Sequence, residues 1–127
     1  RDKGADIVLS AHDHHYERFA PQDAEGNDDP ARGLREFLIG TGGARLSKIL
    51  ENYRPHSETR DNSSHGILRL ELLEGKYNWE FIPAAGGNYR DSGSAISRTR
   101  RQKPAPSSRA ASIRWMPRSA SDVRTSK

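Results

Sequence analysis

Alternating apolar and polar positions between Ile67 and Ile82 give the clearest structural signal in the chain. In two short runs every second side chain is apolar, first three leucines and then three aromatic residues: Leu68, Leu70, Leu72, Tyr77, Trp79 and Phe81. This period of two predicts two half-buried β-strands. Glu74-Gly75 lies between the runs and supplies a turn. We therefore predict a β-hairpin whose leucines and aromatic residues share one face.

Two further strands are predicted upstream, each from a compact apolar run. Residues 5–10 combine β-branched and small side chains and favour a strand that is buried on both faces. Residues 35–40 predict a second strand, which leads into a glycine-rich turn at 40–43. Between these strands, residues 22–32 are rich in Asp, Asn, Gly and Pro, which is typical of a solvated loop. Residues 44–64 are mostly polar without a regular period, so we expect an irregular excursion there.

Composition limits the size and the chemistry of the fold. The chain has 127 residues, of which 32% are hydrophobic and 30% charged, which favours one domain with a thin core. It has no cysteine, so disulfides and thiolate metal sites are excluded. Because no apolar run approaches the roughly 20 residues of a membrane-spanning helix, we expect no membrane partner. The first six residues show no signal-peptide pattern.

The net charge of +4 is unevenly distributed. Residues 1–90 hold 12 Lys and Arg against 15 Asp and Glu, whereas residues 91–127 hold 9 against 2. Residues 92–127 consist largely of Ser, Arg, Ala and Pro, and such a composition predicts a disordered basic tail that follows a folded domain at 1–91. Binding of nucleic acid or another polyanion through the basic run at 98–103 is therefore one alternative function. A non-catalytic β scaffold is another.

Candidate chemistry is concentrated directly after the first predicted strand. His12 and His14 are separated by one residue, so on an extended chain both imidazoles lie on one side, with Cα atoms about 6 to 7 Å apart. Neutral imidazole is a good ligand for Zn, Fe, Mn, Ni and Cu. The end of a buried strand gives such ligands a rigid base and access to water. This pattern predicts a metal site at His12 and His14.

The surrounding residues resemble a known motif. Residues 10–18, Ser-Ala-His-Asp-His-His-Tyr-Glu-Arg, resemble the Gly-His-x-His-x-Tyr-Glu-Arg block of purple acid phosphatases and related calcineurin-like metallophosphoesterases. The resemblance continues more loosely through the Thr-Gly-Gly that follows the second strand and through the hairpin as far as Asp91-Ser92-Gly93. It covers about residues 4–94 and implies an α/β fold class, of which this chain forms the β-rich, C-terminal portion of a metallophosphoesterase β-sandwich.

The same resemblance implies a function. In that family the last histidine block gives one imidazole to each ion of a binuclear centre, which assigns His12 to one metal and His14 to the other. The cofactors would be two divalent or trivalent ions (Fe, Zn or Mn), which activate a water molecule for attack on a phosphate ester. The upstream blocks of the forms Asp-x-His, Gly-Asp-x-x-Asp or Tyr, and Gly-Asn-His are absent from the chain. We therefore expect the missing N-terminal part of the domain as a partner, little activity without it, and an extracellular or periplasmic location.

The residues around His12 and His14 have less specific predictions. His15 either donates a proton to the leaving group or only supports the ligands, and the second role is preferred. Alternation should turn Asp13 away from its neighbouring histidines, and Glu17 should pair with Arg18 or a backbone donor. Ala11 replaces the family's glycine, and its Cβ would crowd a backbone of positive φ. Tyr16 and Arg18 should position the loop by packing and hydrogen bonding, whereas His56 and His65 are expected to be ordinary surface residues.

Overall fold

The computed structural model describes residues 4–49, 51 and 54–97, and in this part of the chain all regular elements are strands. Their bounds are β1 (Ile7–Ser10), β2 (Tyr16–Phe19), β3 (Arg35–Ile39), β4 (Ser57–Asp61), β5 (Gly66–Leu73), β6 (Lys76–Pro83) and β7 (Ser92–Ile96). The predicted β-sandwich is present, but the helical part of the predicted α/β class has no counterpart among the described residues. None of them forms a helix long and apolar enough to cross a membrane.

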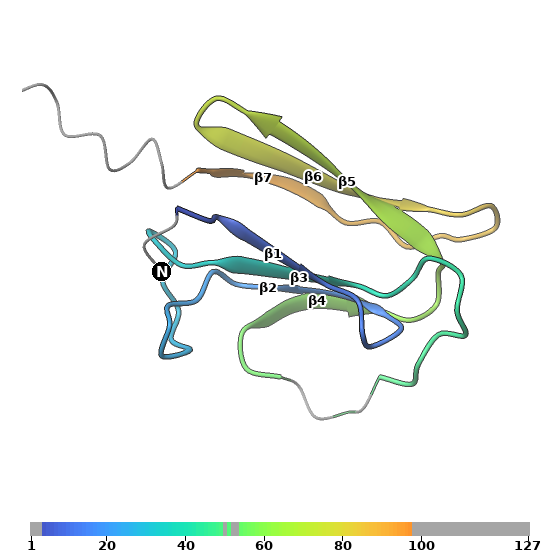
Figure 1. Ribbon diagram of the computed structural model, residues 1–127. Coiled ribbons are helices and arrows are strands. Elements are labelled where there is room, and N and C mark those ends of the chain that lie inside the picture. Colours follow the sequence, from blue (N-terminus) through green and yellow to red (C-terminus); the bar gives the residue numbers. More distant parts are fainter. Residues whose placement is uncertain (1–3, 50, 52–53, 98–127) are drawn as a thin grey trace, which may run out of the picture.

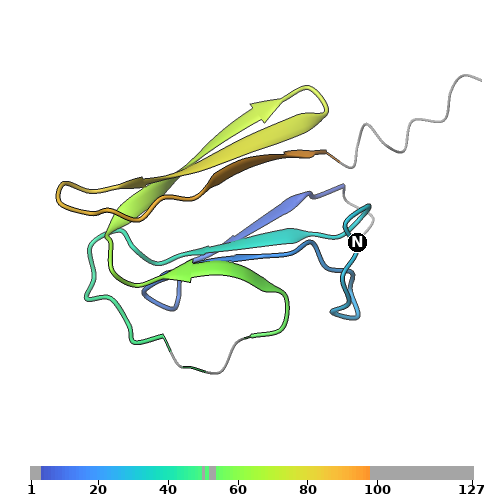
Figure 2. The same ribbon diagram turned by 180° about the vertical axis from the view of Figure 1, so that it is seen from behind.

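The strands form two sheets that face each other (Figures 1 and 2). The first has the order β1-β3-β2-β4, in which β1 pairs parallel with β3 and the other pairs are antiparallel. The second is an antiparallel sheet of order β5-β6-β7. The parallel pair brings the carboxyl ends of β1 and β3 to one edge of the molecule.

The predicted hairpin is confirmed. Leu68, Leu70 and Leu72 of β5 pair with Phe81, Trp79 and Tyr77 of β6, so the apolar residues of both strands share a face. The turn lies at Glu74-Gly75, where Gly75 adopts φ 74°. Residues with a side chain rarely adopt this left-handed backbone conformation, so glycine is favoured at the second turn position.

Aromatic side chains between the sheets form most of the core. Tyr16, Phe37 and Phe81 have no exposed surface, and Tyr77 and Trp79 are nearly as buried. The rings of Phe37 on β3 and Trp79 on β6 meet edge to face at 5.6 Å, and those of Tyr16 and Phe81 lie 4.9 Å apart. Pairs at these separations stabilise the sandwich beyond the burial of their apolar area. Five large rings thus compensate for the small share of aliphatic residues.

The burial predicted for the first strand is wrong. β1 forms where it was expected, but Val8 is 41% and Leu9 55% exposed. In the described part of the chain β1 is an outer strand that pairs with β3 alone. Among these residues β1 has no second paired strand, and Val8 on its outer face and Leu9 on its core face both stay exposed, although the run has the composition of an interior strand.

Three strands lie where none was predicted: β2, β4 and β7. β2 follows the histidine block directly and pairs with both β3 and β4. β4 falls within the expected irregular excursion at 44–64, and its sequence Ser-Glu-Thr-Arg-Asp has no apolar alternation. It is nevertheless held by antiparallel pairing with β2. β7 corrects the predicted boundary at residue 91, because Ser92–Ile96 pair with β6 instead of beginning a disordered tail. The predicted tail from residue 98 onward, including the basic run, lies outside the described residues.

Small side chains explain why β7 lacks an apolar signal. Gly93 pairs with Trp79 and Ala95 with Tyr77. A Cβ atom at Gly93 would overlap the Trp79 ring, so only glycine allows the strand to approach the indole this closely. The strand is therefore specified by its fit to the aromatic face of β6, and not by hydrophobic residues of its own.

Candidate metal site

The histidine loop, residues 11–15, follows β1 and leads directly into β2. The loop at 40–47 follows β3 in the same way. Because β1 and β3 are parallel, both loops emerge at the same edge of the first sheet. In α/β proteins this edge is where ligand-binding loops are placed. The predicted position of His12 and His14 at a strand-to-loop junction is confirmed by the chain's own geometry.

The loop at 40–47 braces the histidine loop through backbone contacts. Ser47 donates its N–H to the His14 carbonyl at 2.8 Å, and Gly40 donates to the His15 carbonyl at 3.1 Å. The Ser47 hydroxyl oxygen lies 3.4 Å from the His14 nitrogen. A Cβ atom at Gly40 would overlap the Asp13 carbonyl oxygen, so the two loops meet at a position that only glycine fits. The backbone that carries His14 is therefore fixed by its neighbour.

The two predicted ligands differ in how they are held. Nδ1 of His14 lies 3.2 Å from the Arg45 carbonyl oxygen, a contact that requires the proton on Nδ1 and leaves Nε2 as the acceptor nitrogen. Metal-binding histidines commonly have this arrangement, in which one nitrogen donates to a carbonyl and the other faces the ion. His12 is exposed, and its side chain has no hydrogen-bond or ion-pair partner among the described residues.

His15 is buried and pairs with Glu17. Its Nε2 atom lies 3.1 Å from a Glu17 carboxylate oxygen, and the two residues are 7% and 2% exposed. Glu17 was expected to pair with Arg18 or the backbone, and that prediction is wrong. Arg18 lies one position along the strand and therefore projects to the opposite face of the sheet. Nδ1 of His15 and Oε1 of Glu17 are buried without a hydrogen-bond partner in the described structure.

The remaining polar residues of this region lie apart from the two candidate ligands. Asp13 pairs with Arg54 at 2.9 Å. His56 contacts Asp28 at 2.6 Å, and His65 contacts the Ala44 carbonyl at 2.9 Å. Ala11 replaces the family's glycine without strain, because its φ is not positive. Among the described residues, His56 is the only non-glycine residue with positive φ. No group of three or more His, Cys, Asp or Glu able to hold a metal occurs in that part.

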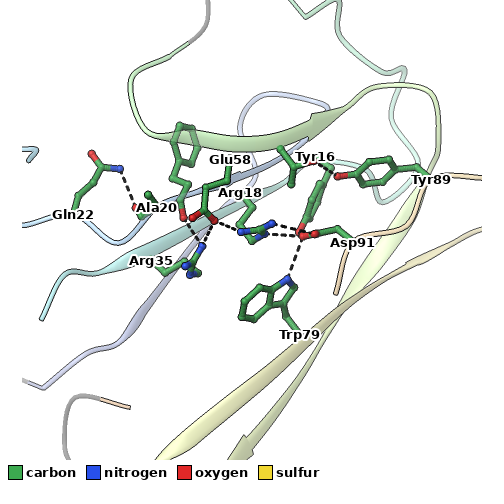
Figure 3. A network of polar contacts seen from close by, with 11 residues as sticks. Tyr16, Arg18, Ala20, Gln22, Arg35, Glu58, Trp79, Tyr89 and Asp91 are labelled. Carbon is green, nitrogen blue, oxygen red and sulfur yellow. Dashed lines mark hydrogen bonds and ion pairs between the residues drawn. The ribbon is translucent and has the colours of Figure 1, made fainter. Parts of the chain in front are cut away.

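A polar network that joins the two sheets was not predicted from the sequence (Figure 3). Asp91, just before β7, accepts hydrogen bonds from Tyr16 at 2.6 Å, from Arg18 at 2.8 and 3.1 Å, and from the Trp79 indole at 3.1 Å. Arg18 also pairs with Glu58 on β4, which pairs with Arg35 on β3. Tyr16 and Arg18 therefore do position β2 by packing and hydrogen bonding, as predicted, and their shared partner is Asp91.

Ionisation of this network is set by its burial and its internal contacts. Burial acts to raise the pKa of Asp91, but hydrogen bonds from Arg18 and Tyr16 outweigh it and hold that pKa below its usual value. Burial, reinforced by the Asp91 carboxylate, raises the pKa of Tyr16 far above the ordinary range. Tyr16 is therefore a fixed donor and Asp91 a fixed anion at neutral pH.

A pocket of the described residues lies away from the histidines. It has a volume of about 460 Å³ and is lined by residues at the other end of the strands, among them Asp6, Arg35, Glu58, Tyr77 and Ala95. None of the residues 11–15 lines it. Residues 11–15 do not line a second described pocket, of about 510 Å³ beside β6, either, so the candidate metal site coincides with neither of the two.

Comparison with known proteins gives one informative likeness. The fold is similar to that of the purple acid phosphatase PPD1 from seeds of yellow lupin (Lupinus luteus), with a TM-score of 0.61 and 23% sequence identity. The match covers 72% of this chain and 17% of the phosphatase chain, so this chain spans about a sixth of the protein that it resembles. No family model matches the sequence, and no curated protein matches it either. The likeness shows a shared fold.

Taken together, the described residues offer two candidate ligands and no complete metal site. His12 and His14 provide two imidazoles, which suit Zn, Fe or Mn. Four-coordinate zinc sites need three protein ligands or more, and binuclear sites need bridging carboxylates besides. In the part of the chain that the structure describes, His12 and His14 alone fall short of either kind of site.

Proposed function

We propose that this chain is the C-terminal part of a metal-dependent phosphoesterase, in which His12 binds one ion of a binuclear centre and His14 binds the other. The observation that carries the proposal is the contact between His14 Nδ1 and the Arg45 carbonyl, which leaves Nε2 as the nitrogen available to a metal. The fold likeness to a purple acid phosphatase supports the same assignment.

The chain's own residues have three tasks in this proposal. Gly40 and Ser47 fix the backbone of the histidine loop, and the Arg45 carbonyl fixes the tautomer of His14. The buried pair of His15 and Glu17 anchors the end of the loop at the start of β2. The bound metals would supply an activated water and neutralise charge on the phosphate oxygens. His15, enclosed next to Glu17, then supports the ligands instead of reaching the substrate.

The remaining ligands are supplied by polypeptide upstream of Arg1 in a longer chain. Two imidazoles cannot replace a bridging carboxylate, so the 127 residues alone bind metal weakly and hydrolyse little. The substrate class is a phosphate ester, and we propose an extracellular or periplasmic setting because the resemblance to purple acid phosphatases implies it.

Hydrolysis of p-nitrophenyl phosphate by the longer gene product, with Mn, Zn or Fe added, tests the proposal. We expect His12→Ala and His14→Ala each to lower kcat/KM by at least about 100-fold and to reduce the metal content of the purified protein. His56→Ala is the matched control, because that side chain contacts Asp28 and touches neither the histidine loop nor the loop at 40–47, and activity should stay within about twofold.

The result that contradicts the proposal is equally specific. An active longer product whose activity and metal content are unchanged by both His12→Ala and His14→Ala would exclude these residues as ligands. A longer product without any metal-dependent hydrolysis would reject the phosphoesterase proposal and favour the alternative of a non-catalytic β scaffold. The 127-residue chain, assayed in parallel, should show no hydrolysis above that of the free metal.

A further inference from the structure

The pocket of about 460 Å³ lies at the end of the sandwich opposite to the histidine loop. Among the residues that line it, Asp6 directly precedes β1 and Arg35 begins β3, whereas the histidine loop follows the last residue of β1. Its volume is within the range of about 300 to 1,000 Å³ that small-molecule sites occupy. We name it the distal pocket. It is separate from the candidate metal site and has the size of a ligand site of its own.

Apolar side chains form much of the wall of the distal pocket. They come from the segment after β2, from the loop before β3 and from the end of β7, and they are Ala20, Pro21, Pro30, Ala31, Ala95 and Ile96. Alanine and proline have almost no side-chain freedom to lose, so a ligand that packs on such a wall costs the protein little conformational entropy. The wall therefore suits the C–H surface of a small molecule.

Arg35 gives the pocket a positive charge from a buried position. The residue is 8% exposed, and its guanidinium donates to the Phe19 carbonyl at 2.8 Å and pairs with Glu58 (Figure 3). The same group lies 5.2 Å from the centre of the Trp79 ring. Its Nε atom is buried without a hydrogen-bond partner among the described residues. A buried donor without an acceptor is unfavourable, so the lining keeps a donor that these residues do not use.

Carboxylates supply the acceptors of the distal pocket. Asp6, Asp28 and Glu58 all line it. Glu58 pairs with Arg35, and Asp6 accepts the Ser97 hydroxyl at 2.7 Å. Because an ionised carboxylate offers about four lone-pair sites, a group that already accepts one bond can accept more. The pocket therefore presents acceptors as well as donors to a ligand.

Tyr77 adds a hydroxyl that is neutral at physiological pH. The residue is 5% exposed and pairs with Ala95 of β7, so both side chains lie on the core face of the second sheet. Burial raises the pKa of Tyr77, although the nearby Arg35 acts in the opposite direction. The phenol therefore stays protonated and is able both to donate and to accept a hydrogen bond.

The charges of the distal pocket favour a neutral ligand. Its lining holds three carboxylates against one guanidinium, a balance that repels phosphate and other anions. An organic cation would be attracted by the carboxylates but would meet the buried guanidinium of Arg35, which cannot be deprotonated. A neutral molecule with several hydroxyl groups avoids both costs. Each hydroxyl donates to a carboxylate or accepts from the guanidinium or the phenol.

We propose that the distal pocket binds a neutral sugar or a similar small polyol. The C–H surface of the ligand lies on the apolar wall, and its hydroxyl groups bond to the polar lining at Asp28, Arg35, Glu58 and Tyr77. The proposal is independent of the proposed function, because residues 11–15 do not line this pocket.

Amide chemical shifts of the isotope-labelled 127-residue chain, followed by NMR during titration, test the proposal. The probes are D-glucose, D-galactose, D-mannose and N-acetyl-D-glucosamine. We expect at least one of them to cause saturable shifts at Gly33, Ala95 and Ile96, with a dissociation constant on the order of 1 mM, and none at His12. Inorganic phosphate and n-butylammonium serve as charged comparisons. The absence of saturable shifts with all four sugars, or tighter binding of either ion, would overturn the proposal.

Two variants locate the sugar. Tyr77→Phe keeps the ring and removes the hydroxyl, and it should weaken the affinity by at least about 5-fold. Asp28→Ala removes an acceptor that is 61% exposed, so the fold is retained, and it should weaken the affinity by at least about 3-fold. Tyr89→Phe is the matched control, because that hydroxyl contacts Thr59 and does not line the pocket, and the affinity should stay within about 1.5-fold.

The variants also separate this proposal from the metal site. Affinity for the sugar that is unchanged by both Tyr77→Phe and Asp28→Ala would place the ligand elsewhere and overturn the distal pocket as its site. His12→Ala and His14→Ala should leave the sugar titration of the 127-residue chain unchanged. Loss of sugar binding in these two variants would contradict a pocket at the opposite end of the strands.

Discussion

Arg18 on β2 and Asp91 at the start of β7 form a two-point ion pair that joins the sheets, with Nε to Oδ2 at 2.8 Å and Nη2 to Oδ1 at 3.1 Å (Figure 3). The pair is largely enclosed, since the two side chains are 14% and 11% exposed. The guanidinium also lies over the Trp79 ring, 5.1 Å from its centre. A polar link therefore sits within the aromatic core, two positions beyond the Tyr16 that leads out of the histidine loop.

Replacement of Asp91 should destabilise the fold. Asp91→Asn removes a charge that accepts bonds from Tyr16, Arg18 and Trp79, and it leaves the Arg18 cation with Glu58 as its remaining partner. We expect the free energy of unfolding at neutral pH to fall by on the order of 3 kcal/mol, measured by urea denaturation. Asp28→Asn, at a carboxylate that is 61% exposed, should change it by less than about 0.5 kcal/mol.

The same pair predicts a dependence on pH. The pKa of Asp91 is lowered in the folded state, so its contribution is present above its unfolded pKa of about 3.9 and is lost as pH falls through the folded value. The difference in unfolding free energy between the parent and Asp91→Asn should therefore shrink as the pH falls below about 4. A difference that stayed constant over this range would show that the carboxylate charge is not what stabilises the link.

Tyr16 and Asp91 should be energetically coupled. Tyr16→Phe removes a 2.6 Å hydrogen bond and should cost about 1 kcal/mol in the parent. In the Asp91→Asn background the cost should be smaller, with a coupling energy of at least about 0.5 kcal/mol in a double-mutant cycle. Tyr89→Phe is the control, because that hydroxyl contacts Thr59 and its effect should add to that of Asp91→Asn. Additivity for both tyrosines would contradict the network.

Elements with a strong pattern of their own were predictable, and elements defined by a neighbour were not. The hairpin of β5 and β6 follows from its leucines, aromatics and turn glycine. β4 has no apolar alternation and exists because β2 offers it an edge. β7 depends on the fit of Gly93 and Ala95 to aromatic rings, which becomes visible only after β6 is in place. The burial of β1 was mispredicted because composition alone does not reveal which edge is left uncovered.

The candidate site shows the same division. The spacing of His12 and His14 after an apolar strand indicated their place on the loop edge. The partners that hold His14 are distant in sequence, since the Arg45 carbonyl and Ser47 reach it over about 30 positions. A backbone carbonyl has no sequence signature. Asp91 lay within the stretch that resembles the phosphatase family, yet only the structure assigns it a role.

The corrected position of β7 changes how the basic tail should be tested. A chain that ends after Ser97 keeps all seven described strands and loses every Lys and Arg beyond Arg90. We expect it to unfold cooperatively at the parent's melting temperature, whereas a chain that ends after Asp91 should lose several degrees because β6 loses its partner. If duplex DNA binds through the tail, salt-sensitive affinity should disappear on truncation after Ser97. Affinity that survives this truncation would exclude the tail as the binding element.

Gly40 gives the sharpest test of how the histidine loop is held. Gly40→Ala introduces a Cβ that overlaps the Asp13 carbonyl, so the loops must separate and His14 loses its fixed position. We expect a loss of about 1 to 3 kcal/mol in stability and, in the longer gene product, weaker binding of Zn or Mn by about 10-fold or more. Gly42→Ala, two residues away, is the matched control, because nothing lies within 4 Å of its Cβ and its φ is not in the left-handed region. That variant should bind metal like the parent and be equally stable or slightly more so. If Gly40→Ala lowers the stability but leaves the metal affinity unchanged, the contact between the two loops supports the fold and not the ligands. The role proposed for the Arg45 carbonyl would then have to be abandoned.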